Sequence, residues 1–198
     1  MKIILFLLAM IGLVSCIQVR VSEGGARTLT GDDAQKLSTF HIANAGKDIP
    51  VSKPEDIIFQ EVNADDLKAI TQLNKKTWIY VWGSWCTPCR QKLPVIAQIH
   101  RDNPDLNIVL AADDYYIKSL QKLLFENKLF MQPYILDQKA FGVKVHEKER
   151  KLWEAFQIET PFADGVPQNY IYDQNGRLIY YGSGSIPENV MNTFFTVR

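Results

Sequence analysis

The sequence of 198 residues predicts an α/β domain with a central mixed β-sheet and helices on both faces of that sheet. Two patterns support this prediction. From residue 63 onward, short β-branched or aromatic runs alternate with segments in which apolar residues recur every three or four positions. Near the C-terminus, residues 173–176 read Asp-Gln-Asn-Gly, which is typical of a tight turn between antiparallel strands.

The predicted elements follow one another along the chain from residue 63. Asn63 is suited to cap a helix that runs through Leu67, Ile70 and Leu73, because its side chain can accept hydrogen bonds from free backbone N–H groups. A buried strand is predicted next, at residues 78–82, followed by a helix with Leu93, Ile96, Ala97 and His100 on one stripe. Further strands are predicted at 106–112, 134–136, 166–172 and 177–181, and further helices at 115–127, 146–157 and 187–195.

The first residues predict an export signal that is not part of the fold. Lys2 makes the start positive, and residues 3–14 form an apolar run broken only by Gly12. This run is too short to span a bilayer, which requires roughly 20 residues, but it matches the apolar region of a signal peptide. We therefore assign residues 1–15 to a signal peptide, with a buried N-terminal helix as the alternative.

Residues 13–16, Leu-Val-Ser-Cys, resemble the lipobox of bacterial lipoproteins. The resemblance implies that Cys16 becomes the first mature residue and carries a diacylglycerol on sulfur and an acyl chain on nitrogen. Each buried methylene stabilises insertion by about 0.8 kcal/mol, so these chains would anchor the protein to a membrane outside the cytoplasm. The alternative is an ordinary secretory signal in which Cys16 has no special role.

The boundary of the globular domain is predicted at residue 56. Residues 16–55 contain scattered glycines and prolines and few apolar patterns, which indicates a tether and irregular lead-in with a short helix near 32–38. The alternative is that part of this region adds a strand to the domain, for which residues 57–59 are a candidate. Residues 56–198 are expected to form the domain itself.

The charge balance argues against a nucleic-acid-binding protein. The chain has 22 Lys and Arg and 22 Asp and Glu residues, so its net charge is zero. The sequence contains no basic stripe with interleaved aromatic residues. Hydrophobic residues make up 46% and charged residues 22%, which is ordinary for a soluble globular domain. We therefore expect no nucleic-acid partner.

Cys86 and Cys89 form a Cys-x-x-Cys pair between the predicted strand at 78–82 and the helix after it. At a helix start, unpaired N–H groups and the helix dipole stabilise negative charge, so the pKa of the Cys86 thiol is expected to fall. The Cys86 thiolate can then attack a substrate disulfide, and Cys89, one turn later, can resolve the mixed disulfide. Pro88 stiffens this loop, and Trp85 shields one side of it.

Two other interpretations of the cysteine pair are weaker. A zinc site needs further ligands, but no cysteine is left once Cys16 is lipidated, and His41, His100 and His146 are scattered. A structural disulfide across a four-residue loop would constrain the unfolded chain little and stabilise weakly. We therefore predict disulfide exchange that needs neither a metal nor another cofactor.

The residues around the pair resemble the active site of thioredoxin-like proteins of the TlpA type. The similarity covers residues 82–90, Trp-Gly-Ser-Trp-Cys-Thr-Pro-Cys-Arg, with Pro94, and a second stretch at 165–176 that begins Gly-Val-Pro. The resemblance implies a thioredoxin-like fold over roughly residues 60–198. It also implies that Pro167 is a cis-proline packed against the dithiol, which leaves the Val166 backbone free to pair with a substrate peptide.

Two positions depart from this family's pattern. Many TlpA-type proteins carry a glutamate where this chain has Lys92, and ordinary thioredoxins have a buried aspartate where it has Tyr80. A carboxylate in either place would handle protons for the resolving thiol, so the departures put a role in cytochrome maturation in doubt. Lys92 is interpreted either as favouring the thiolate or as pointing to solvent.

The connection over residues 137–165 is longer than is usual for this family. Its charged helix is interpreted as a lid, a partner surface or an addition without function. Residues 144–151 are expected to form a solvated helix face, and the aspartates at 113 and 114 are expected to end a strand and cap the next helix.

The sequence thus predicts an extracytoplasmic, lipid-anchored thiol–disulfide exchange enzyme. By the resemblance, it reduces disulfides in partner proteins and receives electrons from a donor in the membrane; oxidation and isomerisation are alternatives within the same class. An alternative from another class is a thioredoxin-fold binding module, such as a metallochaperone or assembly factor, because a reduced dithiol can bind Cu(I).

Overall fold

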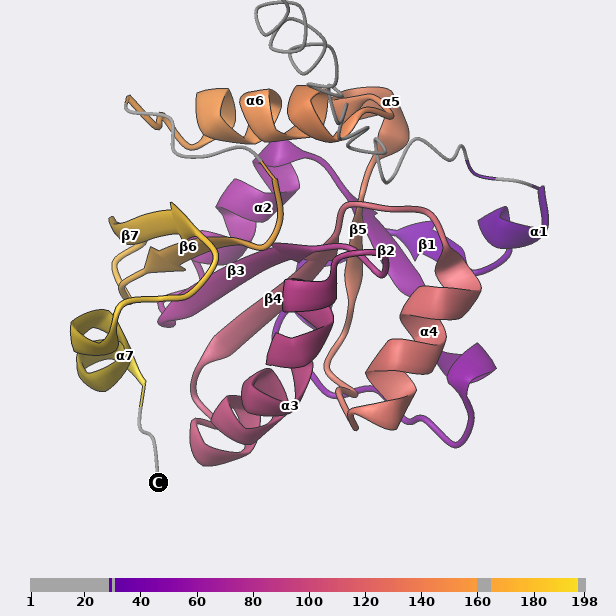
Figure 1. Ribbon diagram of the computed structural model, residues 1–198, viewed down its shortest axis with the longest axis horizontal. Coiled ribbons are helices and arrows are strands. Elements are labelled where there is room, and N and C mark those ends of the chain that lie inside the picture. The colour runs from indigo at the N-terminus through magenta and orange to yellow at the C-terminus, as the bar shows by residue number, and fades with distance from the viewer. Residues whose placement is uncertain (1–28, 30, 160–164, 196–198) are drawn as a thin grey trace, which may run out of the picture.

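The computed structural model describes residues 29, 31–159 and 165–195, and this part of the chain forms an α/β domain around one sheet (Figure 1). The sheet has seven strands in the order β1-β2-β5-β4-β3-β6-β7. The first five strands in this order, from β1 at the edge to β3, are each parallel to their neighbours. Strand β6 is antiparallel to β3, and β7 is antiparallel to β6. The predicted mixed sheet is confirmed, as expected of a thioredoxin-like fold.

Each strand and helix predicted from residue 63 onward is present, and α5 is an additional short helix. The strands are β1 (Leu37–Thr39), β2 (Phe59–Val62), β3 (Thr77–Trp82), β4 (Asn107–Ala112), β5 (Tyr134–Leu136), β6 (Gln168–Tyr172) and β7 (Leu178–Ser183). The α-helices are α1 (Gly31–Ala34), α2 (Ala64–Thr71), α3 (Thr87–Asp102), α4 (Ile117–Glu126), α5 (Gln138–Phe141), α6 (Val145–Ala155) and α7 (Glu188–Phe194). Short 3-10 helices occur at Ile42–Asn44 and Pro54–Asp56.

Side chains of β3 alternate between two apolar cores on opposite faces of the sheet. Trp78, Tyr80 and Trp82 pack with residues of α3, α4 and α7, whereas Ile79 and Val81 pack with residues of α2, α5 and α6. All residues of β3 and β4 are buried, as expected of central strands that helices cover on both faces. Figure 1 shows the same division, with α2, α5 and α6 on one side of the sheet and α3, α4 and α7 on the other.

Helix α2 begins at the predicted cap. The Asn63 side chain accepts hydrogen bonds from the backbone N–H groups of Asp65 (2.8 Å) and Asp66 (3.0 Å). In return, the Asp66 carboxylate accepts a hydrogen bond from the Asn63 N–H at 3.0 Å. This reciprocal arrangement satisfies N–H groups that have no partner within the helix, and it directs Leu67 and Ile70 into the core.

The predicted turn between β6 and β7 is also present. The Asp173 side chain accepts hydrogen bonds from the backbone N–H groups of Asn175 (2.9 Å) and Arg177 (3.0 Å). Gly176 has a φ of +73°, which glycine adopts without the steric cost of a Cβ atom.

The domain begins earlier than the predicted boundary at residue 56. Within the predicted lead-in, α1 is followed by β1, which pairs in parallel with β2 and places Leu37 opposite Phe59. The predicted helix near 32–38 is therefore wrong in its second half, and the candidate strand at 57–59 begins only at Phe59. The physical reason is that the edge of β2 has backbone groups that another strand can satisfy. Residues 1–28, including the predicted signal peptide and Cys16, lie outside the described residues.

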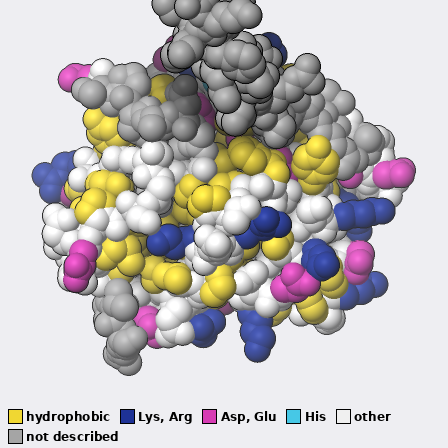
Figure 2. Space-filling model, viewed as in Figure 1, with side chains coloured by type: hydrophobic (Ala, Val, Ile, Leu, Met, Phe, Trp, Pro, Cys, Tyr) yellow, Lys and Arg dark blue, Asp and Glu magenta, His cyan; other side chains and the backbone are white. Residues whose placement is uncertain are grey.

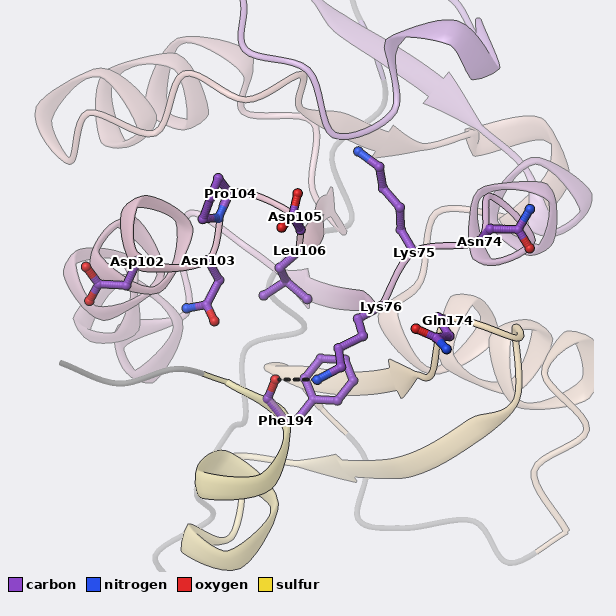
Figure 3. A pocket seen from close by; sticks show the side chains of 10 residues that line it. All are labelled: Asn74, Lys75, Lys76, Asp102, Asn103, Pro104, Asp105, Leu106, Gln174 and Phe194. Carbon is purple, nitrogen blue, oxygen red and sulfur yellow. Dashed lines mark hydrogen bonds between the residues drawn. The ribbon is translucent and has the colours of Figure 1, made fainter.

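A cavity lies at the end of the sheet where β3 and β4 begin (Figure 3). The Lys76 ammonium reaches across it, donates a hydrogen bond to the Phe194 carbonyl at 3.5 Å and lies 5.2 Å from the centroid of the Phe194 ring. The six residues of β3 place about 20 Å of strand between this cavity and the loop that carries the cysteines. The cavity is therefore not part of the cysteine site.

Replacing Asn63 by alanine should lower the free energy of unfolding by about 1 kcal/mol, because the first turn of α2 loses its side-chain acceptor. Lys68, which is exposed on the same helix, gives the control variant K68A, expected to stay within about 0.5 kcal/mol of the wild type. Denaturant unfolding followed by circular dichroism measures both. Equal stabilities of N63A and the wild type would contradict the role of the cap.

Candidate active site

Three chain segments meet at one edge of the sheet. The C-terminal ends of β3 and β4 lie together because these strands are parallel, and the start of β6 lies beside them because β6 is antiparallel to β3. The register places Trp82 opposite Ala112 and Val81 opposite Gln168. The loop after β3, the aspartates after β4 and the loop before β6 are thereby brought together.

Cys86 and Cys89 form a disulfide at the start of α3. Their sulfur atoms are bonded at 2.07 Å, and their Cα atoms are 5.2 Å apart. Cys86 is the N-cap residue of this 16-residue helix, and the Cys89 backbone N–H lies 3.1 Å from the Cys86 sulfur, toward which it donates. After reduction, this N–H and the helix dipole would stabilise negative charge on Cys86. Cys86 is 3% exposed and Cys89 is 0% exposed, so only Cys86 reaches the surface.

The loop before β6 lies against the disulfide. The Val166–Pro167 peptide bond is cis, as the family resemblance implied, and the Val166 carbonyl oxygen lies 3.4 Å from the Cys86 sulfur. The Pro167 carbonyl accepts a hydrogen bond from the Gly184 N–H at 2.9 Å, which ties the loop to the end of β7. Within the described residues, no backbone hydrogen bond engages Val166. The pairing of the Val166 backbone with a substrate peptide beside Cys86 stays a prediction.

The surface beside the dithiol combines apolar, polar and charged side chains. Trp85 is 37% exposed, and Pro88 is exposed too. A groove continues from Trp85 between α3 and α4; its lining residues are Ser84, Trp85, Arg90, Tyr116, Ser119, Lys122, Leu123 and Glu126. In Figure 2, apolar and basic side chains are interspersed over the middle of the visible face. The groove that begins at Trp85 offers apolar, polar and charged side chains to the residues that flank a substrate cysteine.

Tyr80, at the position where ordinary thioredoxins have a buried aspartate, places a neutral hydroxyl group behind the dithiol. Tyr80 donates a hydrogen bond from its hydroxyl to the Cys89 carbonyl at 3.4 Å, and burial raises the pKa of this phenol, so it stays protonated. Lys92 is half-exposed on α3, and its role remains a prediction. No group of three or more His, Cys, Asp or Glu side chains in the described part of the chain is arranged to hold a metal ion.

Asp114 is a site residue that was predicted only as a helix cap. Its carboxylate accepts hydrogen bonds from the Tyr116 N–H at 2.8 Å and also from the Ser84 N–H, two residues before Cys86. Burial raises the pKa of this carboxyl, against the lowering effect of these hydrogen bonds. A Cβ atom on Gly83 would lie only 3.2 Å from the Asp114 carboxylate, so glycine permits this close approach. Asp114 therefore holds the backbone that leads into the dithiol.

Lys148 and Glu149 correct the prediction that residues 144–151 form a solvated face. Lys148 is 0% and Glu149 1% exposed. The Lys148 ammonium lies 3.0 Å from the Asp113 carboxylate, donates to the Asp113 backbone carbonyl and lies 4.6 Å from the Tyr115 ring centroid. Burial raises the pKa of the Asp113 carboxyl to about 6, although Lys148 counteracts the shift. The apolar periodicity of the sequence did not predict this burial. Charged side chains are rarely buried without a partner, and the partners Asp113 and Gly165 lie in other segments of the chain.

Comparison with known proteins identifies relatives, although no protein-family model matches the chain. The chain is 26% identical over 165 residues to the "Probable thiol:disulfide interchange protein DsbE-2" of Pasteurella multocida, covering 82% of this chain and 74% of that relative. It is 19% identical over 155 residues to the thiol-disulfide oxidoreductase ResA of Bacillus subtilis, covering 77% and 74%. It is 31% identical over 106 residues to the thiol:disulfide interchange protein CycY of Rhizobium leguminosarum, covering 54% and 48%.

Solved structures also show a distant similarity to the chain. One is a thiol:disulfide interchange protein of the thioredoxin family from Chlorobium tepidum, with a TM-score of 0.48 and 16% identity over 64% of this chain and 81% of that one. Another is StoA from Bacillus subtilis, with a TM-score of 0.42 and 19% identity over 61% and 82%.

Replacing Lys148 by methionine should destabilise the protein by about 3–5 kcal/mol near pH 8, because the charged Asp113 carboxylate loses its buried partner. The loss should be smaller near pH 5, since the raised pKa of Asp113 leaves this carboxyl mostly protonated there and removes the unpaired charge. Denaturant unfolding at both pH values measures the difference. Lys144 is exposed on the same segment and gives the control K144M; equal losses in both variants would contradict this role of the pair.

Proposed function

We propose that this chain, a TlpA-like thiol–disulfide oxidoreductase with a thioredoxin-like fold, reduces disulfide bonds of extracytoplasmic proteins while a lipid on Cys16 anchors it to a membrane. The observation that carries the proposal is the position of Cys86. Its sulfur lies at the N-terminus of α3 and 3.4 Å from the Val166 carbonyl, beside backbone that a peptide can pair with. A reactive sulfur and a loop suited to dock a peptide thus adjoin each other.

Reduction of a substrate proceeds in two exchange steps. The Cys86 thiolate attacks one sulfur of the substrate disulfide; the substrate S–S bond breaks, and its other sulfur leaves as a thiolate that takes up a proton. Cys89 then loses its proton and attacks the Cys86 sulfur, which releases the second substrate thiol. The chain ends as the Cys86–Cys89 disulfide seen in the structure, and two electrons have passed to the substrate.

The described geometry favours these separate roles for the two cysteines. Cys86 receives the N–H of Cys89 and borders the surface, so it is suited to be the attacking sulfur. Cys89 is fully buried one turn later, where it meets only a disulfide already attached to Cys86. Trp85 and Pro88 lie within two residues of Cys86 and are exposed, and the Val166–Pro167 loop faces its sulfur. These four residues are proposed to seat the substrate.

Reduction is the direction that the resemblance to TlpA-type proteins supports. Each turnover leaves the chain oxidised, so continued reduction requires a dithiol or equivalent donor that restores both thiols. For a protein outside the cytoplasm, that donor must carry electrons across or along the membrane. The proposed partners are therefore disulfide-containing proteins on one side of the cycle and a membrane electron donor on the other.

The membrane anchor is proposed from the sequence of residues 1–16. The signal peptide and the lipobox-like residues 13–16 support cleavage before Cys16 and acylation of its sulfur and nitrogen. In the part of the chain that the structure describes, no helix has the length and apolar character needed to cross a bilayer. A lipid on Cys16 would keep the domain at the membrane where the electron donor lies.

The variant C86S should lose insulin reduction down to the uncatalysed rate, because no attacking sulfur remains. The variant C89S should keep the attack but not the release, so mass spectrometry should find a substrate covalently bound through Cys86. C16S, which alters the proposed anchor alone, is the control and should keep wild-type turnover. Full activity of C86S, or the absence of any adduct on C89S, would refute these assignments.

The variant C16S should also leave the membrane fraction when the full chain is expressed in a bacterium that processes lipoproteins. Mass spectrometry of the wild-type chain should show an acylated N-terminal cysteine, whereas C86S, which keeps the anchor, should behave like the wild type. Recovery of the wild-type chain without acyl groups in the soluble extracytoplasmic fraction would contradict the anchor, while leaving the disulfide chemistry intact.

A further inference from the structure

Two adjacent buried charges distinguish α6 from an ordinary surface helix. Lys148 and Glu149 are 0% and 1% exposed, although α6 covers one face of the sheet (Figure 1) and three other side chains of this helix, His146, Arg150 and Glu154, are exposed. Adjacent helical residues point about 100° apart, so the two side chains reach different partners. Both partners belong to segments that meet at the candidate active site.

Glu149 holds the loop that faces the dithiol. Its carboxylate accepts a hydrogen bond from the Gly165 N–H at 2.7 Å, and Gly165 immediately precedes the Val166–Pro167 peptide bond. The same loop is tied to the sheet from its other end, where the Pro167 carbonyl accepts from the Gly184 N–H. Val166 is thus held between one anchor on α6 and one on β7, with its carbonyl 3.4 Å from the Cys86 sulfur.

Lys148 ties the same helix to the end of β4. Val109 and Ala111 pack in the core that includes α6, whereas Leu110 and Ala112 pack in the core that includes α3. Asp113 continues this alternation and pairs with Lys148 on the α6 side. Asp114 follows it and accepts from the Ser84 N–H on the dithiol side. One end of β4 therefore joins α6 to the loop that carries Cys86.

We propose that α6 positions the substrate-docking loop through Glu149, with the Lys148–Asp113 pair fixing α6 to the sheet edge that carries the dithiol. Glu149 is a positioning residue, because it acts through Gly165 and touches neither sulfur. The inference rests on the proposed function, in that the Val166–Pro167 loop is taken to dock a peptide. It assigns a role to the long connection over residues 137–165: part of it sets how protein substrates are seated.

The positioning role predicts a different effect on large and small substrates. A protein disulfide must pair with the Val166 backbone before its sulfur lies in line with Cys86, whereas a small dithiol reaches the sulfur without that pairing. Loss of the Glu149 carboxylate would release the Gly165 N–H and let the loop move, and reactions that need exact seating are sensitive to shifts of about 1 Å. The chemistry at Cys86 itself would be unaffected.

The test compares E149A, E149Q and the control E154A, which alters an exposed glutamate of the same helix. For E149A, kcat/KM for insulin reduction should fall roughly tenfold, as expected for loss of a charge-assisted hydrogen bond. Reduction of its Cys86–Cys89 disulfide by dithiothreitol should stay within about twofold of the wild-type rate. E149Q keeps an oxygen acceptor without charge, so its loss with insulin should be smaller, and E154A should match the wild type.

Three results would overturn the proposal. They are an equal loss of E149A with insulin and with dithiothreitol, no loss with insulin, or the same loss in E154A. If E149A does not fold, E149Q carries the test, since slower insulin reduction with unchanged dithiothreitol reduction supports the role and unchanged rates with both refute it.

Hydrogen exchange at the Gly165 amide separates this inference from the proposed function. In the folded chain, E149Q should exchange this amide proton several-fold faster than the wild type, because charge-assisted hydrogen bonds are roughly twice as strong as neutral ones. Equal exchange in both would refute the Glu149 contact, whatever the activity. If the wild-type chain reduces no protein disulfide but Gly165 exchange rises as expected, the proposed function fails and the positioning of the loop stands.

Discussion

The antiparallel pairing of β6 with β3 is the constraint on which the candidate active site depends. If β6 ran parallel to β3, the loop before it would lie at the opposite end of the sheet, about 20 Å from the cysteines. The antiparallel register places Gln168 opposite Val81, and the Val166 carbonyl then lies 3.4 Å from the Cys86 sulfur. A reactive sulfur at a helix start becomes a site for a peptide only because this loop adjoins it.

Buried charge on both sides of the sheet edge organises the segments around the dithiol. Asp113 and Asp114 are consecutive, so their side chains point to opposite faces, one to Lys148 on α6 and the other to the Ser84 backbone. A buried ion pair contributes little net stability compared with apolar packing, because desolvation of both charges offsets their attraction. Its effect is on geometry, since a wrong arrangement would leave a buried charge without a partner.

Much of the fold and the centre of the site could be predicted from local patterns. The Asn63 cap, the buried run at 78–82 and the Asp-Gln-Asn-Gly turn each depend on residues within one turn or strand, and the structure confirms all three. Cys86 and Cys89 are three residues apart, so their pairing followed from spacing. The cis bond at Pro167 came from resemblance to a family, because a lone proline carries no such information.

The sequence by itself determined the order of strands and helices from residue 63 onward and the cysteine pair at a helix start, because each is encoded in short-range chemistry; the export and lipidation signals stay predictions from residues 1–16. Only the tertiary structure decided that residues 37–39 join the sheet, that Lys148 and Glu149 are buried and that Asp114 holds the loop before Cys86. These features depend on partners 16 to 35 residues away in the chain, such as Gly165 for Glu149, Phe59 for Leu37 and Asp113 for Lys148. The spacing of apolar residues within one helix or strand shows which of its faces is buried, but it does not show which distant segment packs against that face.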